Sequence, residues 1–215
     1  MAQDGWATFD CYGTLIDWNG GIRGGLARVF GEDRADELLA RYHELEPELQ
    51  ADGTRSYREV LTEAMRRLGA PQSEEDALAE SLPSWESFPE APAALQEARS
   101  RGWKLAILSN TDRDFIDASM ARLAVPFELA IVASEIGSYK PAHRHWERFV
   151  EQTQVAREGH VHVAASLFHD IAPASELGLR SIWINRLGEL PEPRPTRELR
   201  DLDRLPETLD ELAPA

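Results

Sequence analysis

Short apolar runs that alternate with amphipathic stretches are the feature of this sequence that most restricts its fold. The first run covers residues 6–9, and four more follow at 104–108, 129–133, 161–165 and 181–184. Runs that are apolar on both faces are typical of parallel strands that helices cover on each side. Stretches with helical spacing lie between them, at 112–123 and 144–155. The alternation predicts an α/β fold with a doubly wound, Rossmann-like parallel sheet and right-handed crossovers.

The segment between the first two runs has a different character. From residue 21 to about residue 92 it contains no strand-like run. Helical spacing of apolar residues occurs instead, at 22–30, 35–50, 56–68 and, more weakly, 74–82. A helical block inserted into an α/β chain predicts a separate subdomain. We therefore expect an α/β core of residues 1–17 and 91–215 and an all-helical subdomain of residues 18–90.

Charge and cysteine content exclude several classes of protein. The net charge of −15 argues against a nucleic-acid or anionic-membrane partner, because both need a cationic surface. The single cysteine, Cys11, permits no internal disulfide and suits a reducing compartment. The sequence shows neither a secretory signal pattern nor an apolar run of the roughly 20 residues that a membrane span needs. We expect a soluble, cytoplasmic protein that binds neither nucleic acid nor membranes.

Polar side chains follow the ends of the expected strands. They are Asp10 and Thr14, Ser109 and Asn110, Lys140, and His169 with Asp170. Because the carboxyl ends of parallel strands meet at one edge of a sheet, we expect these side chains to converge on one crevice. Each alone has a simpler explanation as a turn residue, a helix cap or a surface charge. Two acids, a hydroxyl and amide pair and a lysine together predict an active site that handles anions.

This ordered set resembles the haloacid dehalogenase superfamily of hydrolases, from residue 9 to residue 185. The helical insert matches the cap subdomain of that family. The resemblance implies that Asp10 is the nucleophile, that Ser109 and Asn110 form the second motif, that Lys140 is the third and that Asp170 is the acid of the fourth. It also implies a homodimer.

Tyr12 separates two branches of that superfamily. The phosphatases carry a second aspartate two residues after the nucleophile, where it protonates the leaving alcohol, and here that place holds Tyr12. Mg²⁺ prefers oxygen ligands, and Asp10 and the distant Asp170 are the carboxylates that remain for it. The pattern Asp-x-Tyr-Gly-Thr is similar to the 2-haloacid dehalogenases, which work without metal. We therefore expect no metal and no other cofactor, and we count Tyr12 as a substrate-binding residue.

A cap arginine is a further signature of the dehalogenase branch, where it binds the substrate carboxylate or the leaving halide. Arg41 stands at the matching place in the expected helix 35–50. Its planar guanidinium suits a carboxylate, because it can donate two parallel hydrogen bonds. The alternative is an arginine on the surface of the helix. With Tyr12, Ser109 and Asn110, we expect Arg41 to bind a small anionic substrate.

The resemblance implies a two-step mechanism. Asp10 displaces halide from C2 of an L-2-haloalkanoate and forms an aspartyl ester, which water hydrolyses to the 2-hydroxy acid. Thr14 would hold Asp10, and Lys140 would keep it ionised. In dehalogenases a serine and an asparagine position the water, but here their places hold Ala165 and Leu167. His169 is a replacement general base, with packing at a helix start as the equal alternative.

Two other functions stay open on the sequence alone. One is a phosphatase that uses Mg²⁺ to hydrolyse a small phosphorylated metabolite without the second aspartate. The other is a binding or regulatory protein that has kept the fold and lost turnover. Halide release that resists a chelator favours the dehalogenase, whereas cleavage of an aryl phosphate favours the phosphatase.

Overall fold

The computed structural model describes residues 5–51 and 53–212. Six strands in this part of the chain form one parallel sheet, in the order β3-β2-β1-β4-β5-β6. They are β1 (Trp6–Phe9), β2 (Lys104–Ser109), β3 (Leu129–Val132), β4 (His160–Ala164), β5 (Arg180–Ile184) and β6 (Arg197–Leu199). The prediction of a parallel α/β sheet is confirmed, and β6 adds a short edge strand that the sequence analysis did not predict.

Strand β1 lies where the strand order reverses. Its last residue, Phe9, pairs with Ile107 of β2 on one side and with Val163 of β4 on the other. Ligands of open parallel sheets bind in the crevice beyond the carboxyl ends of the strands at such a point. Asp10 follows Phe9 directly, so the topology places its side chain in that crevice.

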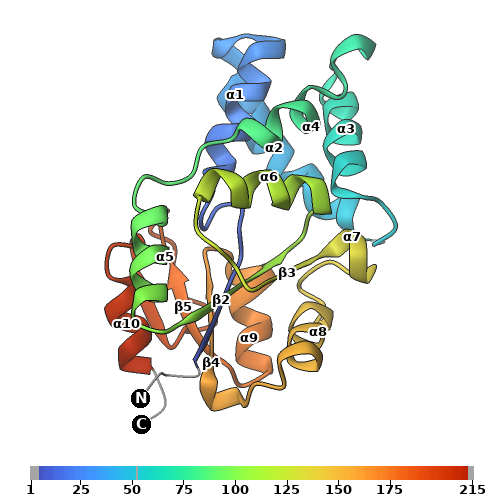
Figure 1. The fold of residues 1–215 in the computed structure, drawn as a ribbon. Coiled ribbons are helices and arrows are strands. Elements are labelled where there is room, and N and C mark those ends of the chain that lie inside the picture. Colours follow the sequence, from blue (N-terminus) through green and yellow to red (C-terminus); the bar gives the residue numbers. More distant parts are fainter. Residues whose placement is uncertain (1–4, 52, 213–215) are drawn as a thin grey trace.

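Helices cover both faces of the sheet (Figure 1). On β2, Leu105 and Ile107 join one hydrophobic cluster, while Ala106 and Leu108 join another, as alternate residues of a strand must. The helices that follow β2 and the later strands are α6 (Arg113–Leu123), α7 (Ala133–Ile136), α8 (Arg144–Thr153), α9 (Ala172–Glu176) and α10 (Leu205–Leu212), and α5 (Ala91–Ser100) precedes β2. Short helical turns lie at Gln72–Glu74, Leu82–Ser84 and Arg157–Gly159, and a π-helical turn lies at Leu167–Ile171.

Four helices after β1 form a layer above the carboxyl edge of the sheet (Figure 1). They are α1 (Trp18–Phe30), α2 (Glu32–Gln50), α3 (Tyr57–Leu68) and α4 (Ala77–Ser81), which we call the helical layer. Helix α1 begins four residues before the predicted start because the side chain of Asp17 accepts a hydrogen bond from the backbone of Gly20. We propose that residues 18–90 form a subdomain on a core of residues 1–17 and 91–215.

The chain passes between the sheet and the helical layer along two adjacent segments, one around Ile16 and one around Ser87. These two residues form an antiparallel bridge. Backbone hydrogen bonds flank it, from Asp17 to the Glu86 carbonyl at 2.8 Å and from Phe88 to the Leu15 carbonyl at 2.9 Å. The two crossings are therefore joined side by side.

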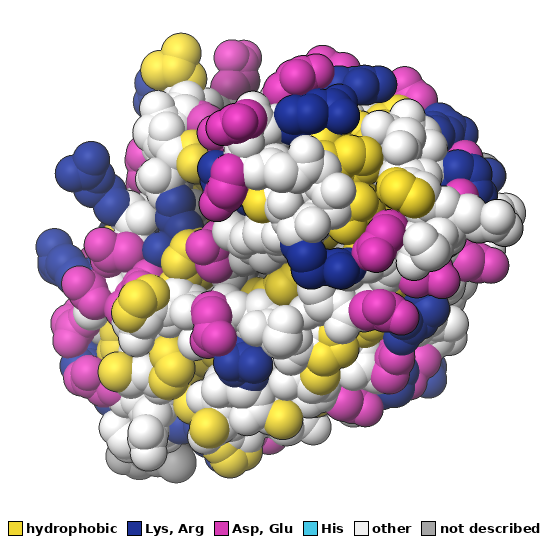
Figure 2. Space-filling view, turned by 90° about the horizontal axis from the view of Figure 1, so that it is seen from above, with side chains coloured by type: hydrophobic (Ala, Val, Ile, Leu, Met, Phe, Trp, Pro, Cys, Tyr) yellow, Lys and Arg dark blue, Asp and Glu magenta, His cyan; other side chains and the backbone are white. Residues whose placement is uncertain are grey.

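The surface of the protein carries charged side chains of both signs. Figure 2 shows acidic and basic side chains interspersed over the face seen from above the helical layer. None of the helices within residues 5–51 and 53–212 combines the length and apolarity of a membrane span.

Candidate active site

A cavity of about 630 Å³ lies at the carboxyl edge of the sheet, beneath the helical layer. The sheet side of its lining includes Asp10, Tyr12, Ser109, Asn110, Lys140, His169 and Asp170. The helical layer contributes Trp18, His43, Glu46, Gln50 and Tyr57. With the exception of Thr14 and Arg41, each residue that the sequence analysis assigned to the site lines this cavity.

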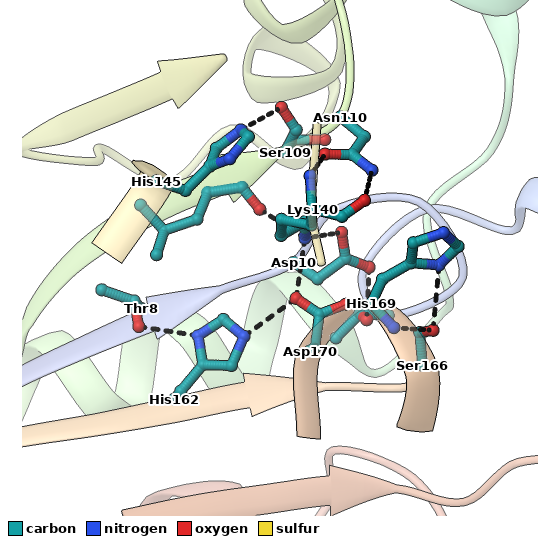
Figure 3. Close-up of polar contacts among 12 residues, drawn as sticks. Thr8, Asp10, Ser109, Asn110, Lys140, His145, His162, Ser166, His169 and Asp170 are labelled. Atoms are coloured by element: carbon teal, nitrogen blue, oxygen red, sulfur yellow. Dashed lines mark hydrogen bonds and ion pairs between the residues drawn. The ribbon is translucent and has the colours of Figure 1, made fainter. Parts of the chain in front are cut away.

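Lys140 joins the two aspartates at the centre of the site (Figure 3). Its ammonium nitrogen lies 2.9 Å from Asp10 Oδ1, 2.7 Å from Asp170 Oδ1 and 2.8 Å from the Leu108 carbonyl. Lys140 is 2% exposed and Asp170 is 1% exposed. All three ammonium hydrogens are thus used within the protein, and the charge of Lys140 is balanced between two carboxylates.

The three charged groups differ in their affinity for protons. Burial raises the pKa of Asp10 above its ordinary value, although the adjacent Lys140 acts in the opposite direction. Burial acts in the same way on Asp170, but Lys140 and His162 outweigh it and hold the pKa of Asp170 below its usual range. Burial opposes the charge on Lys140, yet the two carboxylates raise the pKa of Lys140. Asp170 and Lys140 form the permanent ion pair, and Asp10 is the carboxylate with the more basic oxygens.

Thr14 fixes the second oxygen of Asp10. Its hydroxyl donates to Asp10 Oδ2 at 2.9 Å and accepts from the backbone N–H of Ala165 at 2.9 Å. The turn between Asp10 and Thr14 contains Gly13 with φ of 91°, a left-handed conformation that glycine adopts without strain. Although Thr14 does not line the cavity, it locks the carboxylate in one orientation.

A buried chain of polar groups continues from Asp170 into the sheet (Figure 3). His162 Nε2 lies 2.9 Å from Asp170 Oδ1, and His162 Nδ1 lies 2.8 Å from the hydroxyl of Thr8. The same hydroxyl lies 2.7 Å from His160 Nε2. The sequence analysis missed this chain. Its signal is two histidines two residues apart in an otherwise apolar strand, because residues at that spacing face the same side of a sheet.

Asn110 and Ser109 have different roles. The Asn110 side chain accepts from the backbone N–H of Lys140 at 2.6 Å and donates to the Lys140 carbonyl at 3.0 Å, so it positions the lysine. Ser109 Oγ is buried and has no hydrogen-bond partner among the described residues, and neither does Asp170 Oδ2. Buried polar atoms are normally satisfied, so these two atoms mark places where a substrate or water molecule would bind.

His169 lines the same cavity as Asp10. Its backbone N–H donates to Ser166 Oγ at 3.0 Å, and its Nδ1 lies 3.1 Å from the same oxygen. Burial lowers the pKa of His169, so the imidazole is neutral near pH 7. A neutral imidazole held by one nitrogen can accept a proton at the other.

Tyr12 forms an aromatic wall of the cavity. Its hydroxyl lies 3.0 Å from Ser119 Oγ, and its ring packs against Trp85 and Tyr57. Burial raises the pKa of the Tyr12 hydroxyl. The residue therefore supplies an apolar surface and holds its proton too tightly to protonate a leaving group.

Arg41 lies on the exposed surface of α2, and the described residues that line the cavity do not include it. The buried stripe of this helix contains Leu38, Tyr42, Glu46 and Leu49. The residues of α2 that line the cavity are His43, Glu46, Pro47 and Gln50. Arg41 stands two residues before His43, a rotation of about 200°, and so lies on the opposite side of the helix. The structure does not bring Arg41 together with Asp10.

Glu46 is the charged residue that α2 presents to the cavity instead. Its Oε1 accepts from the Tyr57 hydroxyl at 3.1 Å, and that hydroxyl accepts from Trp18 Nε1 at 2.9 Å. Burial raises the pKa of Glu46 to about 7. The sequence analysis missed it, although an acid in the apolar stripe of an amphipathic helix is a signal of a buried polar group.

Comparison with known proteins places the chain among hydrolases. The haloacid dehalogenase-like hydrolase family matches residues 6–178. A phosphoserine phosphatase from Thermus thermophilus is 31% identical over 185 residues, which are 82% of this chain and 74% of that protein. An (S)-2-haloacid dehalogenase from Pseudomonas sp. (strain YL) is 30% identical over 194 residues, or 85% and 83% of the two chains.

A solved structure shows the same fold. The L-2-haloacid dehalogenase from Xanthobacter autotrophicus superposes with a TM-score of 0.84 and 19% identity, over 97% of this chain and 99% of that one. The helical layer above the parallel sheet is thus common to both proteins.

Proposed function

The chain belongs to the haloacid dehalogenase-like hydrolases, and from that membership we propose that it is a cofactor-independent hydrolase of the L-2-haloacid dehalogenase type. One observation carries the proposal: Asp10 is held between Lys140 and Thr14 beside Tyr12, which occupies the place of the phosphatase acid. The (S)-2-haloacid dehalogenase of Pseudomonas sp. (strain YL) supports it as a relative over most of the chain.

In the first step, a carboxylate oxygen of Asp10 attacks C2 of the haloalkanoate. The new C–O bond forms as the C–X bond breaks, and the halide leaves with the bonding electrons. Lys140 and Thr14 hold the two carboxylate oxygens, so the nucleophile enters the reaction already oriented. Ser109 Oγ is a free donor for the substrate carboxylate.

In the second step, water hydrolyses the aspartyl ester. His169 takes a proton from the water as it attacks the ester carbonyl, and returns a proton to the departing oxygen of the 2-hydroxy acid. The acyl C–O bond of the ester breaks in this step and leaves Asp10 as the carboxylic acid, which then releases its proton to solvent and regains its charge beside Lys140. His169 thereby takes over the task of the polar groups that are absent at Ala165 and Leu167.

A phosphatase is the second candidate, because the phosphoserine phosphatase from Thermus thermophilus is 31% identical. Such an enzyme would need Mg²⁺, and its donors here would be Asp10 and Asp170. Both are hydrogen-bonded to the ammonium of Lys140. Mg²⁺ is commonly held by one or two carboxylates with water and a substrate phosphate, so these two aspartates do not separate the candidates. Tyr12 favours the dehalogenase, because it holds the place of the phosphatase acid and burial raises the pKa of its hydroxyl.

Halide release tests the proposal. The substrates are L-2-chloropropionate and bromoacetate, with EDTA present and with an aryl phosphate plus Mg²⁺ in a parallel assay. We expect sustained halide release that EDTA leaves unchanged and that Asp10→Asn abolishes. Asp114→Asn, on the exposed start of α6, is the matched control and should retain activity. Mg²⁺-dependent phosphate release without halide release would overturn the proposal, and inactivity on both substrates would indicate a binding protein.

A further inference from the structure

The charges that line the cavity are predominantly negative. Its acidic residues are Asp10, Asp17, Glu46, Asp170 and Glu189, and within the described residues its lysine and arginine are Lys140 and Arg186. Both cations already stand in ion pairs. Lys140 bridges the two aspartates, and Arg186 lies 2.7 Å from Glu90 and donates to the Thr14 carbonyl at 3.1 Å. Arg186 Nε has no hydrogen-bond partner among the described residues.

The two histidines of the lining add no positive charge at neutral pH. Burial lowers the pKa of His43 as well as that of His169. The ring of His43 stacks on Trp18 with centroids 5.1 Å apart, and its Nε2 lies 2.9 Å from Asn19 Oδ1. A second anionic group on a substrate would therefore find no cation on the helical side of the cavity as far as the structure describes it.

The α2 wall has the composition of a site for a positive charge. Glu46 stands there beside Trp18 and Tyr57, and the chain of hydrogen bonds through the Tyr57 hydroxyl fixes the carboxyl. Carboxylates and aromatic faces are the groups that stabilise a bound ammonium ion. The cavity of about 630 Å³ also has room for a substrate with an arm beyond C2.

We propose that the substrate carries an ammonium group on the arm that extends from the reacting carbon to α2, and that Glu46 binds it. This inference rests on the proposed function, because it takes Asp10 as the nucleophile at C2. Ser109 then faces the substrate carboxylate, and Glu46 faces the opposite end. The substrate has no net charge at neutral pH, which agrees with a cavity that has no unpaired cation to offer in its described lining.

Glu46 suits this task because its charge responds to the ligand. In the free protein its pKa is about 7, so the ionised and protonated forms are both populated at neutral pH. An ammonium ion within hydrogen-bonding distance favours the carboxylate and lowers that pKa. A methyl group in the same place offers no cation, so it gains no charge-assisted hydrogen bond from Glu46. Glu46 thus discriminates between an ammonium and a methyl group of nearly the same size.

Two isosteric pairs of substrates test the inference through halide release. The first pair is 3-amino-2-chloropropanoate and 2-chlorobutanoate, and the second is 4-amino-2-chlorobutanoate and 2-chloropentanoate. In at least one pair we expect kcat/KM to favour the ammonium compound by about tenfold or more, the size of one charge-assisted hydrogen bond. Glu46→Gln should bring the ratio close to one. Glu44→Gln removes the same charge from the exposed side of α2 and should leave the ratio unchanged.

A preference for the methyl compound in both pairs, or an ammonium preference that survives Glu46→Gln, would overturn the inference. Binding of the hydrolysis products to the wild-type protein separates this from a failure of the proposed function. Calorimetry with 3-amino-2-hydroxypropanoate and 2-hydroxybutanoate, and with the two longer products, requires no turnover. Tighter binding of an amino product without halide release would refute the dehalogenase and retain ammonium recognition. Halide release with equal binding within both product pairs would do the reverse.

Discussion

His162 Nε2 lies 2.9 Å from Asp170 Oδ1, and this contact links the catalytic charges to the interior of the sheet. Because ionised Asp170 only accepts hydrogen bonds, His162 Nε2 is the donor in this contact. The Thr8 hydroxyl lies between His162 Nδ1 and His160 Nε2, at 2.8 Å and 2.7 Å. Asp170 is thus held by Lys140 from the cavity and by His162 from the interior of the sheet.

Removal of the Thr8 hydroxyl tests this chain. Thr8→Val leaves His162 Nδ1 and His160 Nε2 buried without partners, and we expect a loss of about 2 to 4 kcal/mol in the free energy of unfolding. Thr8→Ser keeps the hydroxyl and should cost about 1 kcal/mol or less for the methyl group. Urea denaturation measures both variants. Equal stability of the two would show that the hydroxyl does not connect the histidines.

Lys140→Met should destabilise the protein and abolish activity. It leaves Asp10 and Asp170 as two buried carboxylates without a cation, a change that typically costs about 3 to 5 kcal/mol. The pKa of Asp10 should rise further, because the charge that opposed the effect of burial is gone. Lys104→Met, at the start of β2, is the control for loss of a lysine. Halide release and urea denaturation should show a far smaller effect for the control.

The pH dependence of halide release should report on Asp10. Burial raises its pKa above 3.8, and only the ionised form is a nucleophile, so kcat/KM should fall as the pH is lowered through that raised pKa. Thr14→Val removes a hydrogen bond that favours the carboxylate, so the acid limb should move to higher pH. Thr14→Ser should keep the wild-type profile. An acid limb that does not respond to Thr14→Val would contradict the assignment to Asp10.

Glu46 should make the free energy of unfolding depend on pH. Its folded pKa of about 7 lies above the reference value of 4.5, so between these values the folded protein holds a proton that the unfolded chain has released. The contribution of Glu46 to stability therefore falls as the pH rises from 4.5 to 7, by up to about 3 kcal/mol. Buried histidines such as His145 and His160 act in the opposite direction over this range, because burial lowers the pKa of each to about 3. The test is therefore the difference from the wild type: Glu46→Gln should lose the Glu46 contribution, whereas Glu44→Gln should follow the wild-type curve. Urea denaturation at about pH 4.5 and about pH 8 measures the difference.

His169→Asn should separate the two chemical steps. Halide release requires Asp10, whereas hydrolysis of the ester requires a base, so we expect a burst of one halide per protein followed by slow turnover. Intact-protein mass spectrometry should detect the accumulated aspartyl ester. His143→Asn, at the N-terminal end of α8 and hydrogen-bonded to Glu176, is the control and should show no burst. Unchanged steady-state turnover in His169→Asn would assign the base to another group.

The sheet and the helical layer could be predicted because both depend on hydrophobic pattern. Strand β2 is a continuous apolar run, and the stripes of α2 and α3 repeat at helical spacing. Strand β6 could not be predicted in this way, since it is short, largely exposed and lies at the edge of the sheet. The start of α1 depends on the cap formed by the side chain of Asp17, which hydrophobicity does not reveal.

In the candidate site, too, some positions could be predicted from the sequence and others could not. Asp10, Lys140 and Asp170 were predicted to lie together because the carboxyl ends of parallel strands meet at one edge of the sheet. The prediction for Arg41 failed because the sequence identifies a helix more easily than it identifies which side of the helix faces the cavity. A step of one residue, from Arg41 to Tyr42, exchanges an exposed side chain for a buried one. The stripe shared with Tyr42 shows that Glu46, four residues on, faces inward. The family resemblance identified α2 as the helix that contributes to the site, and only the packing of the structure showed which face of α2 lies toward the cavity.

The two crossings at Ile16 and Ser87 have a mechanical consequence. The bridge between them attaches the helical layer to the sheet side along one edge. A second attachment lies at the start of α3, where the backbone N–H groups of Tyr57 and Arg58 donate to the carboxylate of Asp112 at 3.0 Å and 2.9 Å. The layer that carries Glu46 is therefore fastened to the sheet that carries Asp10 at two separate places, so the two walls of the cavity are held in register with each other.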